Sequence, residues 1–266
     1  MLIVGFCHSN KMKIKVIIPC HLDSKRLDQK VLIDINGLPM VEHVRRRVLL
    51  SKKTENVFIA TGDQRIKDVV ESFGGDVLFT KKKHENGTSR ISEAISNTDC
   101  THVILIQGDE PLIIPEYIDI FIDQMLNSES YNMWNAISKL NSNEVYNDLS
   151  KVKCLIDVHG QFITCFRKTP ISSPKNNLSK IIFKVQGLIA YKKKFLLKLV
   201  DSPSTIYSNE ESIEQMKAIE AGEKIKSILL PSSLPSVNTK KELEHVFGIL
   251  EKDSIQKKIF QQIIKS

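Results

Sequence analysis

The stretch that decides the fold is Lys13–Lys30, KIKVIIPCHLDSKRLDQK. Its first part, Lys13–Pro19, is rich in β-branched residues and almost continuously apolar, which is typical of a strand buried on both faces of a parallel sheet. The part that follows, Pro19–Lys30, is polar and mostly basic. Because ligands of open α/β sheets bind beyond the carboxyl ends of the strands, this loop is the first candidate binding site.

Strand and helix patterns alternate through the rest of the first half of the chain. The expected strands are Lys13–Pro19, Asn56–Thr61, Asp76–Thr80 and His102–Gln107, and the expected helices are Pro39–Ser51, Gln64–Phe73, Thr88–Ser96 and Pro115–Asn127. This β-α-β-α order predicts an α/β fold with a mostly parallel, Rossmann-like sheet flanked by helices.

The second half predicts a smaller antiparallel β element. It has a hairpin pattern in Val152–Val158 and Gln161–Phe166 around Gly160, further strands at Ile181–Tyr191 and Ile225–Leu230, and amphipathic helices at Glu210–Ala221 and Lys240–Glu251. The segment Lys168–Ser179 is rich in Pro, Ser, Asn and Lys, which predicts a mobile loop. We find no repeat or long linker, so residues 13–266 are expected to form one domain after a loose extension, residues 1–12.

Composition excludes several classes of protein. The 266 residues are 41% hydrophobic and 26% charged, which rules out collagen, a disordered chain and a membrane bundle. Five cysteines without a C-x-x-C pair argue against a disulfide framework or zinc site, and we expect a cytoplasmic protein. The net charge of +7 fits nucleic acid, an anionic membrane surface or a small polyanionic substrate. Because aromatics are 6% and are not interleaved with the basic clusters, a nucleic-acid partner is not expected. No stretch approaches the ~20 apolar residues that a membrane helix needs, so no membrane partner is expected either.

The basic loop Pro19–Lys30 has the composition of a triphosphate site. Ser24, Lys25, Arg26 and Lys30 supply positive charge and donors beside exposed backbone N–H groups. The loop is not a P-loop, because G-x-x-x-x-G-K-[ST] is absent. On its own, a solvated basic loop is the more frequent interpretation of such a stretch.

Two acidic residues follow the strongest strand, in Gln107–Pro111 (QGDEP). Asp109 and Glu110 at the end of a buried strand are well placed to hold Mg²⁺, which takes one or two carboxylates together with substrate phosphate oxygens. The alternative is a plain turn, since Gly, Asp and Pro are turn formers.

Two further stretches precede helices. In His84–Arg90 (HENGTSR), Gly87 permits close backbone approach and Thr88 is a candidate cap, and the helix start attracts an anion. In Ser236–Thr239, Asn238 stands just before the last long helix. In both stretches, ordinary helix capping is the alternative.

Taken together, the motifs resemble the 3-deoxy-manno-octulosonate cytidylyltransferases, also called CMP-Kdo synthetases. The shared text extends in order and spacing from Lys13 to Glu251. It comprises IIP with S-x-R-L-x-x-K-x-L (Ile17–Leu32), INGxPM (Ile35–Met40), IAT (Ile59–Thr61), GGDV (Gly74–Val77), HxxGTxR (His84–Arg90), QGDEP (Gln107–Pro111), Arg167–Thr169, GxxAY (Gly187–Tyr191) and EQxxxxExGEKI (Glu214–Ile225).

The resemblance implies a nucleotidyltransferase fold and a Mg²⁺-dependent enzyme. It implies that CTP is joined to the anomeric hydroxyl of a 3-deoxy ulosonic acid, Kdo or a related sugar acid, with release of pyrophosphate. The hydroxyl would attack the α-phosphorus in line, without a covalent enzyme intermediate. A homodimer and a role in bacterial surface polysaccharide or lipopolysaccharide synthesis are implied as well.

Residue roles follow from the same resemblance. Those implied to be catalytic are Arg26, Lys30 and Asp109, and those implied to bind the nucleotide are Ser24, Arg26, Lys30, Thr61, Gly87, Thr88, Arg90 and Gln107. Those implied to bind the sugar acid are Glu110, Arg167, Glu211, Glu214 and Gln215, and those implied to bind the metal are Asp109 and Asn238.

The chain departs from the family pattern in both pockets. His21 replaces Arg, Asp28-Gln29 replaces Pro-Gly, Asn86 and Ser89 replace Ser and Glu, and Val185 replaces His. Asn238 replaces an acidic metal ligand and supplies no charge. Three consequences are open: metal affinity is reduced, Glu110 compensates for the missing charge, or the chain has lost some activity. Two alternatives stay open: a different sugar acid, such as an amino-Kdo, and a nucleotide-binding paralogue with little or no turnover.

Overall fold

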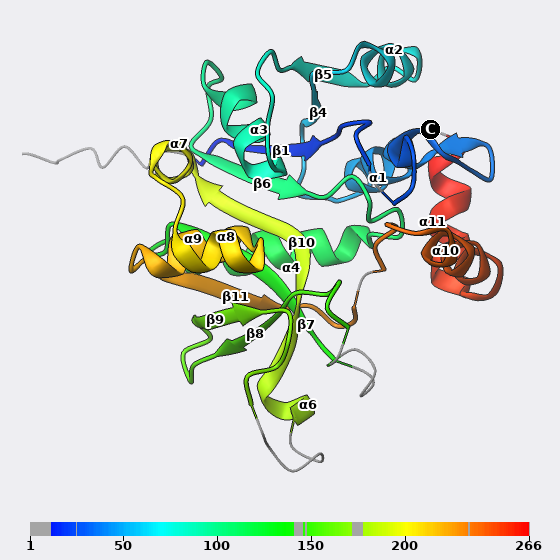
Figure 1. Ribbon diagram of the computed structural model, residues 1–266. Helices are drawn as coiled ribbons and strands as arrows, with labels where there is room; N and C mark the ends of the chain where they lie inside the picture. The colour runs from blue at the N-terminus through cyan, green and yellow to red at the C-terminus, as the bar shows by residue number, and fades with distance from the viewer. Residues whose placement is uncertain are drawn as a thin grey trace, which may run out of the picture.

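The computed structural model describes residues 12–24, 26–140, 146, 148–171, 178–233 and 235–265. Over these residues, nine strands form one sheet in the order β11-β7-β10-β6-β1-β4-β5, and β8 and β9 extend it beside β10 (Figure 1). The strands are β1 (Ile14–Pro19), β4 (Val57–Thr61), β5 (Asp76–Phe79), β6 (His102–Ile106), β7 (Met133–Lys139), β8 (Lys153–Ile156), β9 (Phe162–Phe166), β10 (Ile182–Lys192) and β11 (Ile225–Leu229). A separate hairpin joins β2 (Asp34–Ile35) and β3 (Leu38–Pro39).

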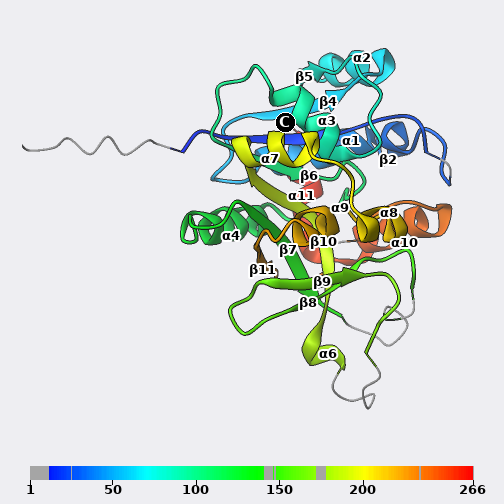
Figure 2. The ribbon, with the colours of Figure 1, turned by 60° about the vertical axis from the view of Figure 1, so that its left-hand side comes forward.

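Helices cover both faces of the sheet (Figures 1 and 2). They are α1 (Met40–Leu49), α2 (Gln64–Ser72), α3 (Gly87–Ile95), α4 (Pro115–Leu126), α6 (Leu178–Ile181), α7 (Lys193–Asp201), α8 (Ile206–Glu211), α9 (Glu214–Glu220), α10 (Lys240–Lys252) and α11 (Ser254–Ile263), with a 3₁₀ turn, η1, at Lys30–Leu32. One core cluster joins α1, α2 and α4 to the sheet, and a second joins α3, α7 and α9 to its other face.

The predicted mixed α/β fold is confirmed. Strands β6, β1, β4 and β5 are parallel neighbours, whereas β10 runs antiparallel to both β6 and β7. In β1, Val16 and Ile18 belong to one core cluster and Ile17 belongs to the other. The strand is therefore buried on both faces, as its continuous apolar run predicts.

The parallel register brings three loops together. Ile17 of β1 lies beside Leu105 of β6, and Pro19 lies beside Ala60 of β4. Because neighbouring parallel strands end at the same edge, the loops after β1, β4 and β6 lie side by side there. The candidate site is built from these loops.

The structure differs from the predicted elements in several places. Strand β7, which lies between β11 and β10, was not predicted, and neither were α7 and α11. The helix predicted over Glu210–Ala221 is two helices, α8 and α9, because Ser212 between them has a left-handed backbone (φ 51°). The predicted mobile loop Lys168–Ser179 ends in α6, while its residues 172–177 and all but Met12 of the predicted extension lie outside the described residues.

Within the described part of the chain, no helix has the length and apolar character needed to cross a bilayer.

The α1 residue His43 is fully buried and couples stability to pH. Its Nε2 lies 2.7 Å from the Ile35 carbonyl oxygen, and its ring stacks on Phe260 of α11. Burial lowers its pKa from 6.5 to about 4, so the ring is neutral in the folded protein. Because the unfolded chain binds a proton more readily, stability is full above pH 6.5 and is lost as the pH falls toward 4.

We therefore expect His43 to remove about 2 kcal/mol from the free energy of unfolding between pH 7 and pH 5. In a His43→Gln variant, the amide can still donate to the carbonyl but does not titrate. The free energy of unfolding of this variant should therefore fall by about 2 kcal/mol less than that of the wild type between pH 7 and pH 5. Urea unfolding of both proteins at the two pH values measures the difference. Equal losses in both proteins would contradict this assignment.

Candidate functional site

Two adjoining cavities lie at the carboxyl ends of β1, β4 and β6. The first, about 600 Å³, is lined by the loops after these three strands and by the start of α3. The second, about 540 Å³, is lined by the middle of β10, the start of α9 and residues from the loops before β8 and α10. Gln107 and Asp109 line both cavities. The two cavities therefore meet at the QGDEP loop.

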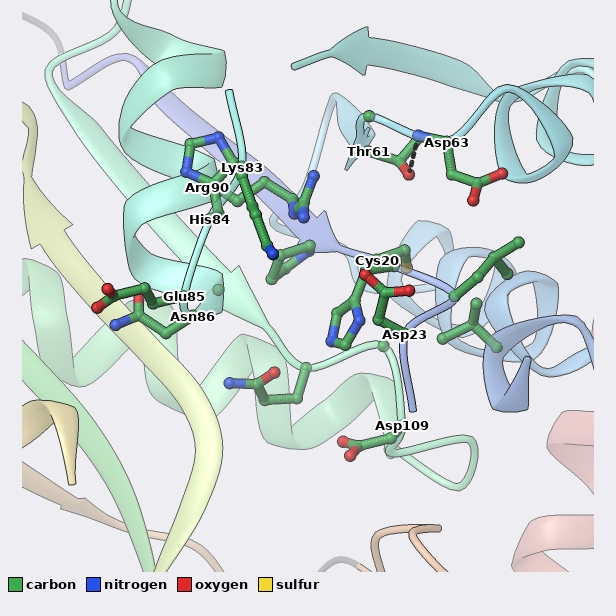
Figure 3. A pocket seen from close by; sticks show the side chains of 18 of the residues that line it. Cys20, Asp23, Thr61, Asp63, Lys83, His84, Glu85, Asn86, Arg90 and Asp109 are labelled. Carbon is green, nitrogen blue, oxygen red and sulfur yellow. Dashed lines mark hydrogen bonds between the residues drawn. The ribbon is translucent and has the colours of Figure 1, made fainter. Parts of the chain in front are cut away.

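The first cavity is polar, and it is lined by four cations (Lys30, Lys82, Lys83 and Arg90) and four carboxylates (Asp23, Asp63, Glu85 and Asp109). Figure 3 shows Arg90, Lys83 and His84 on one side, Thr61 and Asp63 on another, and Asp109 at a third edge. Arg90 is held by a 2.8 Å hydrogen bond to the Thr80 hydroxyl. His21 also lines this cavity, and burial, followed by the charges of Arg90 and Lys30, lowers its pKa. The charges of Arg90 and Lys30 therefore both reach this part of the cavity, where they can interact with an anionic ligand.

The start of α3 reaches the first cavity through Gly87. A Cβ atom on this glycine would lie 2.9 Å from Cγ of Pro19, so only glycine lets the helix approach the end of β1 so closely. The N-cap is Asn86, whose side chain accepts a 2.8 Å hydrogen bond from the Ser89 N–H. The helix therefore presents its N-terminus to a ligand in this cavity.

Thr88 does not cap α3 and does not line the first cavity. Its hydroxyl donates to the Glu214 carboxylate and lies 3.3 Å from the Tyr191 hydroxyl. Thr88 and Glu214 line a neighbouring cavity of about 530 Å³. Glu214 has a raised pKa, chiefly because of burial. Thr88 thus links α3 to α9 and does not face the first cavity. Its assignment to the nucleotide stays a prediction.

Three of the predicted residues meet at one point between the cavities. The Lys30 ammonium group donates to Oδ2 of Asp109 at 2.6 Å and to Oδ1 of Asn238 at 2.9 Å. Lys30 comes from η1, Asp109 from the loop after β6 and Asn238 from the segment before α10. Backbone contact fixes the last two, because the Val237 N–H donates to the Asp109 carbonyl oxygen at 2.8 Å.

This cluster offers oxygen ligands for a cation. No group of three or more His, Cys, Asp or Glu side chains within the described ranges could hold a metal ion. Asp109 and Asn238 instead supply one carboxylate and one amide oxygen, both aimed at a single positive charge. Mg²⁺ usually binds through one or two carboxylates and completes its shell with water and substrate phosphate. The pair fits such an ion, with less charge than two carboxylates would supply.

The second cavity contains three of the predicted sugar-acid residues from the QGDEP loop and α9: Glu110, Glu214 and Gln215. Oε1 of Glu110 accepts the Gly187 N–H at 2.9 Å. Burial, followed by the charge of Asp109, raises the pKa of Glu110 to about 7. Gln215 is buried and donates to Oδ1 of Asn135 at 2.7 Å.

Arg167 lines the second cavity but binds backbone oxygens. Its guanidinium donates to the carbonyls of Glu211, Ser212, Leu149 and Ser150, at 2.8, 3.1, 3.1 and 3.4 Å respectively. In this arrangement it fastens the end of α8 to the loop before β8. Its assignment to the sugar acid stays a prediction.

The remaining predicted residues lie as follows. Thr61 lines the first cavity and Arg26, which is exposed, lines the second. Neither Ser24 nor Glu211 is among the residues that line these two cavities, and Lys25 lies outside the described residues.

Sequence reasoning missed four polar residues around the second cavity. Lys184 and Gln186 come from β10, Lys151 from the loop before β8 and Asn135 from β7. The Asn135 amide donates to the carbonyls of Gln186 and Leu188, at 3.0 and 3.3 Å, where the β10 register shifts. For Asn135, Lys184 and Gln186 the only signal in the sequence is a polar side chain within a largely apolar strand, and Lys151 in its loop has no such signal.

Gly187 is expected to be essential for packing β10 against the QGDEP loop. A Cβ atom there would lie 2.6 Å from Cγ of Gln107 and from Oε1 of Glu110. Gly187→Ala should therefore lower the free energy of unfolding by about 1–3 kcal/mol, as urea unfolding would show. Gly248→Ala in α10 is the matched control, because nothing lies within 4 Å of its Cβ position. A loss no larger than that of the control would contradict the packing argument.

The fold and the paired cavities define an α/β nucleotidyltransferase. A solved CMP:2-keto-3-deoxy-manno-octonic acid synthetase complexed with CTP is similar, with a TM-score of 0.83, 29% identity, and coverage of 91% of this chain and 99% of that one. The cytidylyltransferase family matches residues 15–225.

Curated relatives narrow the family further. The chain is 34% identical over 246 residues to the 3-deoxy-manno-octulosonate cytidylyltransferase of Fusobacterium nucleatum, covering 92% of this chain and 100% of the relative. It is 33% identical over 240 residues to the 8-amino-3,8-dideoxy-manno-octulosonate cytidylyltransferase of Shewanella pealeana, covering 87% and 96%. The chain belongs to the cytidylyltransferase family, among the 3-deoxy-manno-octulosonate cytidylyltransferases and their 8-amino relatives.

Proposed function

We propose that the protein transfers the cytidylyl group of CTP to the anomeric hydroxyl of a 3-deoxy ulosonic acid, Kdo or its 8-amino relative, and releases pyrophosphate. The observation that carries this proposal is the Lys30–Asp109–Asn238 cluster at the border of two cavities. Each cavity has room for one substrate, and the shared residues Gln107 and Asp109 lie where the two substrates would react.

The first cavity suits the nucleotide. Lys30, Lys82, Lys83 and Arg90 line it, and the N-terminus of α3 adds backbone N–H donors at Gly87. A triphosphate requires this combination, because fixed cations and oriented N–H groups together offset its charge. The second cavity, with its mixture of acidic, basic and amide side chains, suits the polyhydroxylated sugar acid.

Asp109 and Asn238 are the residues that would hold Mg²⁺. When bound, the ion supplies positive charge that neutralises the triphosphate and makes the α-phosphorus easier to attack. Asn238 supplies no negative charge, so the site should bind the ion more weakly than one with two carboxylates.

The chain itself contributes positioning and charge. Lys30 is placed to stabilise negative charge that develops on the α-phosphate, and Gln107 lies between the two substrates. The sugar hydroxyl forms the new bond to the α-phosphorus and gives up its proton to solvent, while the bond to pyrophosphate breaks. Cys20 is the thiol in the first cavity, and burial raises its pKa to about 12, which makes it a poor nucleophile. Direct transfer between substrates therefore suits the site.

A second candidate function is nucleotide binding with little or no turnover. Asn238 supports this function. His21 supports it as well, because burial lowers its pKa and the ring is a weaker cation than the Arg that the family pattern has at this position. Asp28 also adds negative charge near the loop lysine.

One experiment separates the two functions. The purified protein is incubated with CTP, Mg²⁺ and each member of a panel containing Kdo, 8-amino-Kdo and other ulosonic acids, and pyrophosphate release is followed. We expect release with at least one octulosonic acid and none without an acid. Calorimetric binding of CTP combined with no release from any acid would favour the paralogue.

The product would be an activated sugar donor. We propose that it serves bacterial surface polysaccharide or lipopolysaccharide synthesis in the cytoplasm. The homodimer implied by the resemblance is part of the same proposal, and light scattering coupled to size-exclusion chromatography would test it.

A further inference from the structure

A sugar acid places its carboxylate next to the reaction. In a 3-deoxy-2-ulosonic acid, the anomeric carbon carries both the attacking hydroxyl and the carboxylate. If the hydroxyl reaches the α-phosphorus beside Asp109, the carboxylate must lie in the adjoining part of the second cavity. A cation at that position would bind it in the ground state and distinguish the acid from a neutral sugar.

Four cationic side chains of the described residues line the second cavity: Arg26, Lys151, Arg167 and Lys184. The Arg167 guanidinium donates its hydrogen bonds to backbone carbonyls. Lys151 is paired with Glu242 at 2.7 Å. Arg26 is exposed on the loop after β1, where water screens its charge.

Lys184 differs from these three in its position. It lies on β10 three residues before Gly187, whose N–H is bound by Glu110, the neighbour of Asp109. The Lys184 side chain lines the same cavity as Asp109 and Glu110. Burial lowers its pKa, so the ammonium group is partly shielded from water, and the negative charges of Glu110, Glu242 and Asp148 act on it. A 2.8 Å hydrogen bond from its Nζ to the Ser233 hydroxyl orients the group.

We propose that Lys184 binds the carboxylate of the sugar acid and is the residue that selects an acid over a neutral sugar. This inference rests on the proposed function. A charge pair in a partly dry cavity is stronger than one at the surface, and a carboxylate would also offset the cost of burying the ammonium group. Arg167, by contrast, holds the wall of the cavity together.

The decisive comparison uses two ligands and four proteins. The ligands are the preferred ulosonic acid and its primary carboxamide, which has the same shape without the charge. The proteins are wild type, Lys184→Met, Lys184→Arg and Lys194→Met, an equal loss of charge at an exposed position on α7. Thermal unfolding of each variant checks that it is folded.

We expect Lys184→Met to raise KM for the acid about 10–100-fold, the equivalent of one charged hydrogen bond, with KM for CTP unchanged. The preference of the wild type for acid over carboxamide should disappear in Lys184→Met, return partly in Lys184→Arg and persist in Lys194→Met. A Lys184→Met enzyme that keeps the preference overturns the inference and leaves the proposed function standing.

The inference also has a readout that does not need turnover. If wild type releases no pyrophosphate, calorimetry of the acid and the carboxamide with the CTP-loaded protein gives the same comparison as dissociation constants. If wild type binds the acid more tightly than the carboxamide and Lys184→Met does not, the role of Lys184 is supported even though the transfer reaction fails. If wild type binds neither ligand, both the inference and the proposed function are wrong.

Discussion

Asp109→Asn is expected to lower kcat for pyrophosphate release by about 10³-fold, because it removes the only carboxylate aimed at the Lys30–Asn238 point in the described structure. The substitution keeps the size of the side chain. Activity would be measured with saturating CTP, Mg²⁺ and sugar acid, and circular dichroism would verify the fold. Activity within tenfold of wild type would remove Asp109 as a metal ligand.

Asn238→Asp is the complementary change at the same point. It adds the negative charge that the family pattern has at this position, while the Lys30 ammonium group is close enough to balance it at 2.9 Å. We expect the Mg²⁺ concentration that gives half-maximal activity to fall by about tenfold, the equivalent of one modest charge interaction. An unchanged or higher Mg²⁺ requirement would show that Asn238 does not contact the ion.

Lys30→Met is the second change with a large expected effect, a loss of about 10²–10³-fold in kcat. Only 13% of the Lys30 side chain is exposed, so its charge acts with little screening on a phosphate at the border of the cavities. The substitution also leaves Asp109 without the ammonium group that it binds at 2.6 Å.

Lys82→Met is the matched control for this prediction. Lys82 lines the same cavity but is exposed, so its removal should cost less than about tenfold. Lys30→Arg should recover part of the lost activity, because it restores the charge with a different shape. Equal losses in Lys30→Met and Lys82→Met would mean that general positive charge, and not the position of Lys30, matters.

The sequence predicts the fold well where burial is uniform. Strand β1 after Lys15 and strand β6 after His102 are apolar without interruption, and their interpretation as buried strands is confirmed. Strand β7 was missed because Asn135 and Ser138 break its apolar pattern, although both are buried and hydrogen-bonded in the structure. The break at Ser212 was missed because nothing in its sequence marks a left-handed backbone.

The sequence predicts which loops form the site, but it does not predict the directions in which their side chains point. Lys30, Asp109 and Asn238 follow from the loops that carry them, and the structure brings them together. The direction of Thr88 depends on Glu214, which is 126 residues later in the chain. Such pairings are set by tertiary packing, so no local pattern reveals them.

The central claim is that the α-phosphorus of CTP is transferred to the sugar acid. Its most direct test is a single turnover with enzyme in excess over CTP, with Mg²⁺ and the preferred ulosonic acid, followed by ³¹P NMR. The account predicts one phosphodiester signal of a CMP-linked sugar and one pyrophosphate for each CTP consumed. Unchanged CTP, or its conversion to CDP and inorganic phosphate, would contradict it.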